Sequence, residues 1–551
     1  MKLLVVSISN GNRCSMVRVF TYFFFGCGFL ILLLPIKSPF NLFDEGSAVF
    51  NALRIMQGDT PYKDFWTTYP PGQFYVLRAV FHVFGSYVLA ARLYDTVVRL
   101  CLVVLIYAIT KRLATRWLSF LATSVSVVLL SSVGHYGYAV FPAMALCLCA
   151  LLVSMVSLEK KRPSSFVLAG VLLGIASLFR WDIAFYGLAS IGSSIILVNS
   201  LIRNPDERMW PARLQPATLV TAGFGATFLL GYSCIAVQCG FHDLFDQTVV
   251  FPATKIPAIR RLPIPGLMQI YDVITPISFS TLTSTGAYNW LKFYLPLMTY
   301  VTALLCYGRA LLVNSPFPGK TELFGGMASS LFGLLLFNQA YSRFDYIHVL
   351  PTSILMWVAA AHIFQMCTKN VGRLSRAVSS VMPVILAVPY LYFQAPEIAS
   401  TSKNFSLMHC HSRLERAAGV FTDRDQQDAI EYLHSHSSQS EPIFVGNLRH
   451  DMLFINDIGF YFLANRTCAT RYHELCPGLA DSLPVQKEII EALSRHNVQW
   501  IVLVDIKQST EPNASSVSTG ITILDEFIRE NYRSVAQFGI YHILKKAASS
   551  E

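Results

Sequence analysis

The stretch Asn41-Leu-Phe-Asp44-Glu45-Gly46 places two adjacent carboxylates just beyond an apolar segment, residues 19–36. It is followed by two stretches rich in proline, glycine and aromatic residues, Gly58-Asp-Thr-Pro61-Tyr62-Lys63-Asp64-Phe65-Trp66 and Tyr69-Pro70-Pro71-Gly72. Carboxylates at a membrane edge are costly unless water, a cation or a ligand compensates their charge. We therefore interpret residues 37–91 as a structured loop outside a membrane, and Asp44 and Glu45 as part of a functional site.

Composition identifies the chain as a membrane protein. Of its 551 residues, 53% are hydrophobic and 14% are charged, and the mean hydropathy is +0.47. A hydrocarbon core about 30 Å thick needs roughly 20 apolar residues per helix. On that criterion we predict about eleven transmembrane helices, near residues 19–36, 92–110, 117–133, 139–158, 165–179, 183–200, 216–238, 291–313, 322–340, 350–367 and 378–394. The first is expected to be a retained anchor, because no small-x-small cleavage site follows it.

Positive charge predicts the orientation. Lysine and arginine concentrate in alternate connections between these segments, and the positive-inside rule keeps such connections in the cytoplasm. The connections begin with Lys2, Arg13 and Arg18 and continue with Lys111, Arg112, Arg116, Lys160, Lys161, Arg162, Arg203, Arg208, Arg213, Arg309, Lys320, Lys369, Arg373 and Arg376. We expect a cytoplasmic N-terminus in a bacterial inner membrane, with loops 37–91 and 240–290 and everything after residue 395 outside. The net charge of +10 is explained by this topology, so no nucleic-acid partner is expected.

The chain divides near residue 395 into two predicted domains. Residues 1–395 form a polytopic α-helical membrane domain, and residues 396–551 form a more polar, soluble external domain. In the second, short β-rich runs at 442–446 and 500–504 alternate with helical patterns at 426–434, 485–496 and 523–531, and a strand-like run covers 534–544. This alternation predicts a small α/β domain with a largely parallel sheet. It has no glycine-rich phosphate loop, so we assign it no nucleotide site.

Cysteine and histidine patterns do not predict a metal site. Nine of the twelve cysteines precede residue 400 and lie mostly in predicted membrane segments. In an oxidising compartment a Cys468–Cys476 disulfide is one alternative, and two free thiols are the other. His409 and His411, which flank Cys410, are interpreted as part of a surface linker. No metal ligands or cofactors are assigned, and whether a divalent metal takes part stays open.

Two further groups of ionisable residues lie at the outward ends of predicted membrane helices. The first contains Arg343, Asp345 and His348. Arg343 suits a phosphate, because its charge is permanent and its donors match paired oxygens. The structural alternative is a self-satisfied pair of Arg343 and Asp345 that closes a helix end. Arg180 and Asp182 form the second group and leave the same two alternatives open.

The predicted external loop 240–290 is basic and rich in proline. Lys255, Arg260 and Arg261 stand there among Pro252, Pro257, Pro263 and Pro265. We interpret the segment as a solvated loop at the lipid headgroups, with a lid as the alternative, because external positive charge alone is weak evidence for a site.

The acidic pair and the two arginine groups are predicted to share one external face. There Asp44 would deprotonate a hydroxyl or amine while cations stabilise a departing phosphate, which fits transfer from a phosphate-linked, lipid-soluble donor. A flippase for lipid-linked sugars and a non-catalytic assembly subunit are the alternative functions. A flippase should show pseudo-repeated halves and broken midplane helices, whereas the ionisable groups here lie at helix ends.

The blocks Phe43-Asp44-Glu45-Gly46, Pro61-Tyr62-Lys63-Asp64-Phe65-Trp66 and Tyr69-Pro70-Pro71-Gly72-Gln73-Phe74 resemble the first external loop of the GT-C membrane glycosyltransferases. Within that class they look most like the protein O-mannosyltransferases and the bacterial aminoarabinose or polyprenyl-phosphate-sugar transferases. The resemblance covers residues 40–85 well. It implies a multi-span enzyme that takes a sugar from a polyprenyl-phosphate carrier with inversion at the anomeric carbon. It also implies that Asp44 is the catalytic aspartate, with Glu45 beside it.

One position departs from that pattern. Some family members place a lysine directly before the paired prolines to contact the donor phosphate, and this chain has Tyr69 there. We therefore expect the phosphate contact to come from elsewhere, for example from Arg343, and we keep Lys63 and Tyr69 as candidate substrate-binding residues. The resemblance does not decide whether the acceptor is a lipid, a glycan or a protein.

Overall fold

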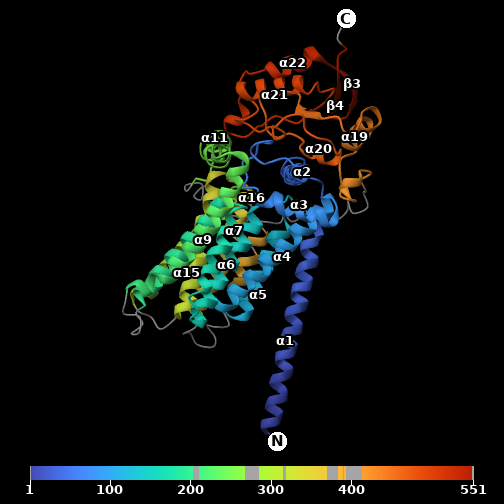
Figure 1. Ribbon diagram of the computed structural model, residues 1–551. Coiled ribbons are helices and arrows are strands. Elements are labelled where there is room, and N and C mark those ends of the chain that lie inside the picture. The colour runs from blue at the N-terminus through green and yellow to red at the C-terminus, as the bar shows by residue number, and fades with distance from the viewer. Residues whose placement is uncertain are drawn as a thin grey trace.

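The computed structural model describes residues 2–202, 210–266, 285–313, 318–368, 383–388, 390–392 and 412–548. A bundle of long helices carries a C-terminal domain at one end, and α1 lies at the edge of the bundle and extends beyond it toward the N-terminus (Figure 1). The described helices of the bundle are α1 (Lys2–Leu33), α4 (Val88–Leu113), α5 (Arg116–Ser131), α6 (Val140–Lys160), α7 (Ser165–Ser177), α8 (Trp181–Leu201), α9 (Trp210–Cys239), α14 (Thr285–Leu312), α15 (Lys320–Ser342) and α16 (Tyr346–Thr368).

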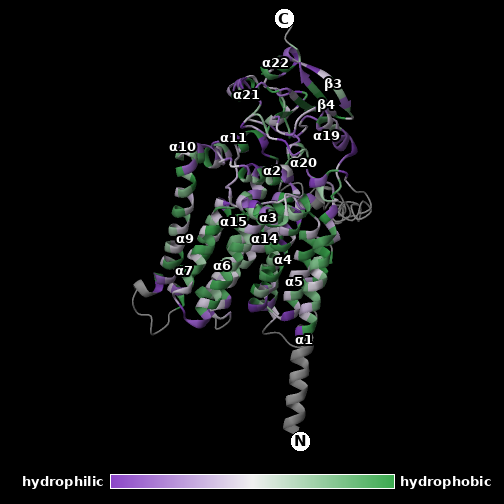
Figure 2. Ribbon diagram, turned by 45° about the vertical axis from the view of Figure 1, so that its right-hand side comes forward, coloured by the Kyte–Doolittle hydropathy of each residue, from purple (hydrophilic) through white to green (hydrophobic). Residues whose placement is uncertain are grey.

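Eight stretches within the described helices are long and apolar enough to cross a membrane. The helices α5 and α7 are shorter but apolar, and they coincide with the predicted segments 117–133 and 165–179. The predicted segment 378–394 is described only in part and is helical where it is described. Hydrophobic residues dominate the bundle, and hydrophilic ones are frequent in the C-terminal domain (Figure 2). The predicted multi-pass helical fold with a soluble domain is thus confirmed.

Small residues let helices of the bundle approach closely. At the crossing of α7 and α9, a Cβ atom built on Gly170 would lie 2.1 Å from the carbonyl oxygen of Val220, and one on Gly223 would lie 2.4 Å from that of Val167. Because lipid tails are as apolar as leucine, close packing of this kind is a main source of helix association in a bilayer.

The predicted loop 37–91 consists largely of two helices. After the short 3₁₀ helix η1 (Leu34–Lys37) come α2 (Asp44–Met56) and α3 (Gly72–Phe84). The helix α2 lies between the bundle and the C-terminal domain, and nearly all of its residues are buried (Figure 1). Phe50 of α2 stacks on Tyr461 with ring centroids 4.9 Å apart, and Phe81 of α3 lies 5.7 Å from Phe462. This loop is therefore the packing surface on which the C-terminal domain rests.

The second predicted external loop, 240–290, begins as a chain of short helices. These are α10 (Phe241–Phe245), the π-helix η2 (Asp246–Val250) and α11 (Phe251–Arg260), and residues 267–284 lie outside the described residues. The ring of Phe251 packs edge-on against Trp66 of the first loop, with centroids 5.0 Å apart. At its other end α11 lies against the C-terminal domain, where Arg260 lies over the ring of Phe454 (Figure 1).

The C-terminal domain is a four-stranded sheet covered by helices on both faces. Its elements are η4 (Glu415–Ala417), α19 (Arg424–His436), β1 (Ile443–Asn447), α20 (Gly459–Leu463), α21 (Leu483–Arg495), β2 (Trp500–Val504), η5 (Ala514–Ser516), α22 (Ile523–Asn531), β3 (Tyr532–Phe538) and β4 (Tyr541–Lys546). The helices predicted at 426–434, 485–496 and 523–531 are present as α19, α21 and α22. Trp500, Val502 and Val504 of β2 share one apolar cluster with α19 and α20, whereas Ile501 and Leu503 share another with α21 and α22.

The prediction of a largely parallel sheet is wrong. The strand order is β1-β2-β4-β3, in which β1 and β2 are parallel while β4 is antiparallel to both β2 and β3. The strand-like run 534–544 is a hairpin, whose turn contains Gly539 with a positive φ of 51°, a conformation that glycine adopts readily. This turn reverses the chain, so β4 enters the sheet against the direction of β2.

Gly46 marks a close approach between α2 and the C-terminal domain. A Cβ atom there would lie 2.5 Å from the backbone nitrogen of Gly459 and 3.0 Å from its Cα atom. Alanine is favoured over glycine inside a helix by about 1 kcal/mol. We nevertheless expect Gly46→Ala to force α20 away, which would lower the apparent melting temperature in detergent and speed proteolysis between the domains. Gly192→Ala in α8, where nothing lies within 4 Å, is the matched control and should not destabilise. Equal melting temperatures for the two variants would contradict this packing.

Candidate active site

The start of α2 is organised by Asn41. Its side-chain oxygen accepts hydrogen bonds from the backbone N–H groups of Phe43 at 3.1 Å and Asp44 at 2.7 Å, which would otherwise lack partners at a helix start. Asp44 and Glu45 consequently occupy the first turn, where the positive end of the helix dipole favours carboxylates. Tyr138 donates its hydroxyl to Oδ2 of Asp44 at 3.2 Å.

Glu45 forms a buried ion pair with Arg92 of α4. Nε of Arg92 donates to Oε1 at 2.7 Å and Nη2 donates to Oε2 at 2.8 Å, and both side chains are almost fully buried. The same guanidinium donates to the carbonyl oxygens of Ile36, Ser38 and Pro39. Both oxygens of Glu45 are thereby occupied. The structure gives Glu45 an anchoring position, distinct from that of Asp44.

The carboxylate of Asp44 lies at a meeting point of several elements. Burial raises the pKa of Asp44, and the hydrogen bond from Tyr138 and the charges of Arg260 and His348 act in the opposite direction. Tyr138 lies in the loop before α6, Arg260 is the last residue of α11, and His348 lies in the first turn of α16. Asp44 is therefore a stronger base than an ordinary aspartate, and cations face it.

Tyr69 joins this group. Although 42% of the residue is exposed, its hydroxyl is desolvated, which together with the charge of Asp44 raises the pKa of Tyr69 to about 12. Arg180 and Arg260 act in the opposite direction. The structure thus brings Tyr69, Asp44, Arg180 and Arg260 within electrostatic range of one another. By contrast, Lys63 is exposed, and no contact among the described residues connects its side chain to this group.

Arg180 and Asp182 pair with each other. Nε and Nη2 of Arg180 donate to the two oxygens of Asp182 at 2.9 and 2.7 Å, and Gln339 donates to Asp182 at 3.4 Å. The indole N–H of Trp181 donates to the carbonyl oxygen of Thr248, which fixes this helix start to η2. This geometry matches the structural alternative, in which the pair closes a helix end beside the site.

Arg343 is occupied by carboxylates. It donates to both oxygens of Glu511 at 3.0 and 2.5 Å, to Asp345 at 2.8 Å, and to the backbone oxygen of Arg260 at 3.0 Å. Asp345 also accepts hydrogen bonds from the backbone and ring of His348. Burial opposes ionisation of Asp345, but the hydrogen bonds and charge of His348, together with Arg343, hold its pKa at about 2. Asp345 therefore stays negative, and little of the Arg343 charge is left for a phosphate.

Of the three arginines Arg180, Arg260 and Arg343, Arg260 is the one without a carboxylate partner at ion-pair distance among the described residues. Its Nε atom is buried and has no hydrogen-bond partner in the described part of the chain. Its guanidinium lies over the ring of Phe454, 5.3 Å from the centroid. A buried donor without a partner is costly, so this position suits an incoming anion. The interpretation of Arg260 as part of a solvated loop missed this, because its surroundings come from distant segments.

Glu474 is a site residue that sequence reasoning missed altogether. This C-terminal-domain carboxyl is buried, accepts a hydrogen bond from Ser47, and accepts another from Asn51 at 3.2 Å, both from α2. Burial raises the pKa of Glu474 to about 7, and the charge of Asp44 contributes. No local pattern marks it, because its partners lie more than 400 residues earlier.

The described residues hold no group of three or more side chains suited to a metal ion. Cys468 and Cys476 are free thiols in the structure, so of the two alternatives for this pair the unbridged one is observed. Cys410, His409 and His411 lie outside the described residues.

The chain resembles known proteins in one segment of its sequence and in its fold. Residues 68–214 match the family described as dolichyl-phosphate-mannose-protein mannosyltransferase. The fold resembles ArnT from Cupriavidus metallidurans bound to undecaprenyl phosphate, with a TM-score of 0.51 and 13% identity over 96% of this chain and 98% of that one. It also resembles the apo form of the Archaeoglobus fulgidus oligosaccharyltransferase, with a TM-score of 0.50 and 13% identity over 87% of this chain and 69% of that one. No curated protein sequence matches the chain.

Residues 68–214 thus resemble a family of mannosyltransferases, and the fold of nearly the whole chain resembles that of ArnT. Both findings agree with the resemblance to GT-C glycosyltransferases inferred from residues 40–85.

The ion pair of Arg92 and Glu45 generates a stability prediction. Arg92→Ala would leave the Glu45 carboxylate buried without a partner, and breaking a buried pair in this way costs about 3–5 kcal/mol. We expect a large fall in the apparent melting temperature of the purified protein in detergent.

Arg112→Ala is the matched control, because Arg112 pairs with Glu159 at 3.4 Å with both side chains over a third exposed. Such surface pairs contribute roughly 0–1 kcal/mol. If Arg92→Ala and Arg112→Ala lower the melting temperature equally, the anchoring role of Glu45 is refuted.

Proposed function

We propose that the chain is an inverting glycosyltransferase that moves a sugar from a polyprenyl-phosphate carrier to an acceptor on the external face of the membrane. The observation that supports this best is the Asp44 carboxylate, held at a helix start with a raised pKa and within electrostatic range of Arg260 and His348. ArnT, whose fold the chain shares, is bound to undecaprenyl phosphate in its structure. A lipid phosphate is therefore the ligand that we assign to the cationic side of the site.

The proposed reaction is a single displacement with Asp44 as general base. Asp44 accepts the proton of the acceptor hydroxyl or amine as that atom forms a bond to the anomeric carbon. The bond between this carbon and the phosphate oxygen breaks on the opposite side of the sugar, and polyprenyl phosphate leaves with the electron pair. Attack opposite the leaving group inverts the anomeric configuration. A base with a raised pKa is suited to this step, because it accepts a proton more readily at neutral pH.

We propose that Arg260 contacts the donor phosphate. Arg343 was the expectation from the sequence, but its donors bind Glu511 and Asp345, whereas Nε of Arg260 is buried without a partner among the described residues. Arg343 also holds the backbone oxygen of Arg260 at 3.0 Å. In this proposal Arg343 positions the end of α11, and Arg260 stabilises the negative charge of the departing phosphate.

The distribution of positive charge supports an external location of the proposed site. α2, α3, α11 and the C-terminal domain gather at one end of the bundle (Figure 1), whereas α6 ends at Lys160, beside Lys161 and Arg162, at the other end. Because positive residues in short loops stay in the cytoplasm, we propose that the end with Asp44 faces outward, in a bacterial inner membrane with a cytoplasmic N-terminus.

Substituting Asp44 tests the proposed function. Asp44→Asn should reduce transfer of labelled sugar from a polyprenyl-phosphate donor by about 10²–10⁴-fold, the usual contribution of general acid–base catalysis. Asp64→Asn, in the same loop but exposed, is the matched control and should transfer normally. Glu45→Gln should lose less transfer than Asp44→Asn. Normal turnover by Asp44→Asn, with inactive Glu45→Gln, would reverse the assignment.

The pH dependence of sugar transfer provides a second test of Asp44 as the general base. Transfer should fall as the pH drops through the raised pKa of Asp44, because the protonated carboxyl cannot accept a proton. Tyr138→Phe removes a hydrogen bond that favours the charged form, so the acidic limb of the rate profile should move to higher pH. Tyr136→Phe serves as the control, and an acidic limb unmoved by Tyr138→Phe would count against Asp44 as the base.

Substitutions of Arg260 and of Arg343 should have different effects, the first on kinetics and the second on stability. Arg260→Ala removes a charge-assisted contact and should raise the Michaelis constant for the lipid donor, lower turnover, or both, by roughly tenfold to a hundredfold in total. Arg260→Lys should recover part of this loss, because it keeps the charge without the paired donors. Arg343→Ala should instead lower the melting temperature. A donor-binding defect in Arg343→Ala, with unchanged stability and with normal Arg260→Ala, would return the phosphate contact to Arg343.

A further inference from the structure

A cleft of about 260 Å³, lined by both polar and apolar side chains, lies where the parallel strands β1 and β2 end. Ligands in α/β sheets bind preferentially at the carboxyl ends of parallel strands. The polar and aromatic side chains that line this cleft are Asn447, Arg449, Phe454, Asp505, Lys507 and Gln508.

One buried group in the cleft lacks a partner. Asn447, the last residue of β1, is 5% exposed, and its Nδ2 group donates to the backbone oxygen of Ile455 at 2.9 Å. Its Oδ1 atom accepts no hydrogen bond from any described residue. A buried acceptor without a donor is costly, so the cleft offers a hydrogen-bond acceptor to a ligand that carries O–H or N–H groups.

The cleft is connected to the candidate active site through two of its walls. The ring of Phe454 contacts the Arg260 guanidinium at 5.3 Å. The segment after β2 runs from Asp505 in the cleft to Glu511, which binds Arg343. One wall of the cleft thus contacts Arg260, whose charge acts on Asp44, and another leads to the carboxylate that binds Arg343.

We propose that this cleft binds the acceptor and that the acceptor is a carbohydrate chain, an inference that rests on the proposed function. The cleft presents an amide, a carboxylate, an ammonium and an aromatic ring, which together satisfy hydroxyl groups and the apolar face of a sugar. The charges of Asp505 and Lys507 are opposite in sign, and Arg449 pairs with Asp451, so an uncharged ligand fits. A peptide would be expected to add along a free strand edge, whereas this cleft lies at strand ends.

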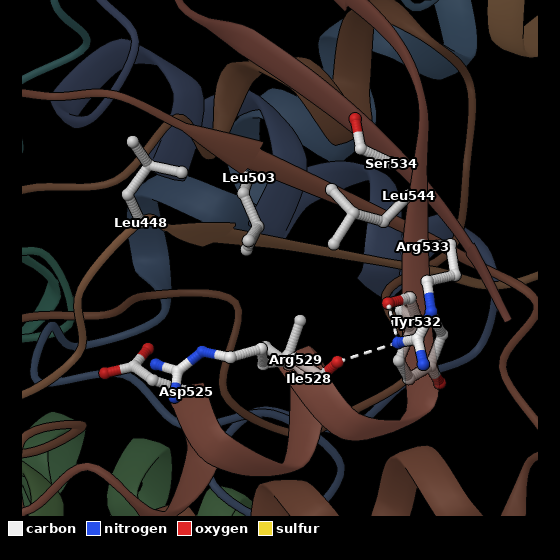
Figure 3. Close-up of a pocket in the computed structure, with 9 residues that line it drawn as sticks. All are labelled: Leu448, Leu503, Asp525, Ile528, Arg529, Tyr532, Arg533, Ser534 and Leu544. Carbon is white, nitrogen blue, oxygen red and sulfur yellow. Dashed lines mark hydrogen bonds between the residues drawn. The ribbon is translucent and has the colours of Figure 1, made fainter. Parts of the chain in front are cut away.

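A second hollow lies in the same domain. It has a volume of about 440 Å³ and lies beside α22, with Leu503 and Leu544 of the strands opposite Ile528 of the helix and Arg529 at its rim (Figure 3). Leu448 borders both hollows. Because it borders neither Phe454 nor the segment that ends at Glu511, it provides a control surface in the same domain.

The test uses the full-length chain, purified in detergent, on a printed glycan array. Wild-type protein should bind a set of uncharged glycans. The double variant Asp505→Ala with Lys507→Ala should bind them about tenfold more weakly or worse. Both residues are exposed, so an unchanged melting temperature is expected and is checked. Arg529→Ala in the second hollow should bind like the wild type, and Asp44→Asn should bind glycans while failing to transfer sugar.

The outcomes separate this inference from the proposed function. Failure of the wild type to bind glycans, loss of binding in Arg529→Ala with retention in the double variant, or preferential capture on a matching peptide array would each overturn the carbohydrate cleft. Glycan binding that the double variant loses, combined with normal sugar transfer by Asp44→Asn, would support the cleft and refute Asp44 as the base.

Discussion

The end of the bundle that carries the C-terminal domain depends on one buried guanidinium, that of Arg92. It binds both oxygens of Glu45 and three carbonyls at the end of η1 and just beyond it, so it ties together η1, α2 and α4. Removing these charges from water is expensive, and the arrangement is stable because both members of the pair are fully hydrogen-bonded. This constraint also fixes the position of Asp44. Its neighbour is fixed, so its carboxylate is held by a helix and not by a mobile loop.

The C-terminal domain completes the site that the membrane domain begins. Phe50 stacks on Tyr461, Gly46 lets α20 approach, and Glu474 accepts hydrogen bonds from α2. On the opposite side Glu511 binds Arg343, whereas Arg260 has no carboxylate partner among the described residues. One acid of the C-terminal domain thus satisfies a nearby charge, and the other, Glu474, binds the polar side chains of α2. A boundary at residue 395 describes composition well, but the site crosses it.

Local features were predictable from the sequence, and distant pairings were not. The strand 500–504 and the helix 523–531 coincide with their predictions because short-range periodicity specifies them. Asp44 was recognisable as a carboxylate at the end of an apolar segment. Glu474 and Glu511 were not, because their partners lie 427 and 168 residues away and no nearby pattern indicates a contact. The antiparallel direction of β4 depended on the turn at Gly539, which lies inside an apparently continuous run.

The separation of Arg343 from Glu511 also orders events during biosynthesis. A chain grows from its N-terminus at about 5–20 residues per second, so the ribosome makes Glu511 roughly 8–34 s after Arg343. At the start of that interval α16 is still to be made, and throughout it α2 has no covering domain and Arg343 has no Glu511. The contacts of the C-terminal domain with α2 and Arg343 thus form last. An unfinished chain presents Asp44 on a helix that the C-terminal domain does not yet cover.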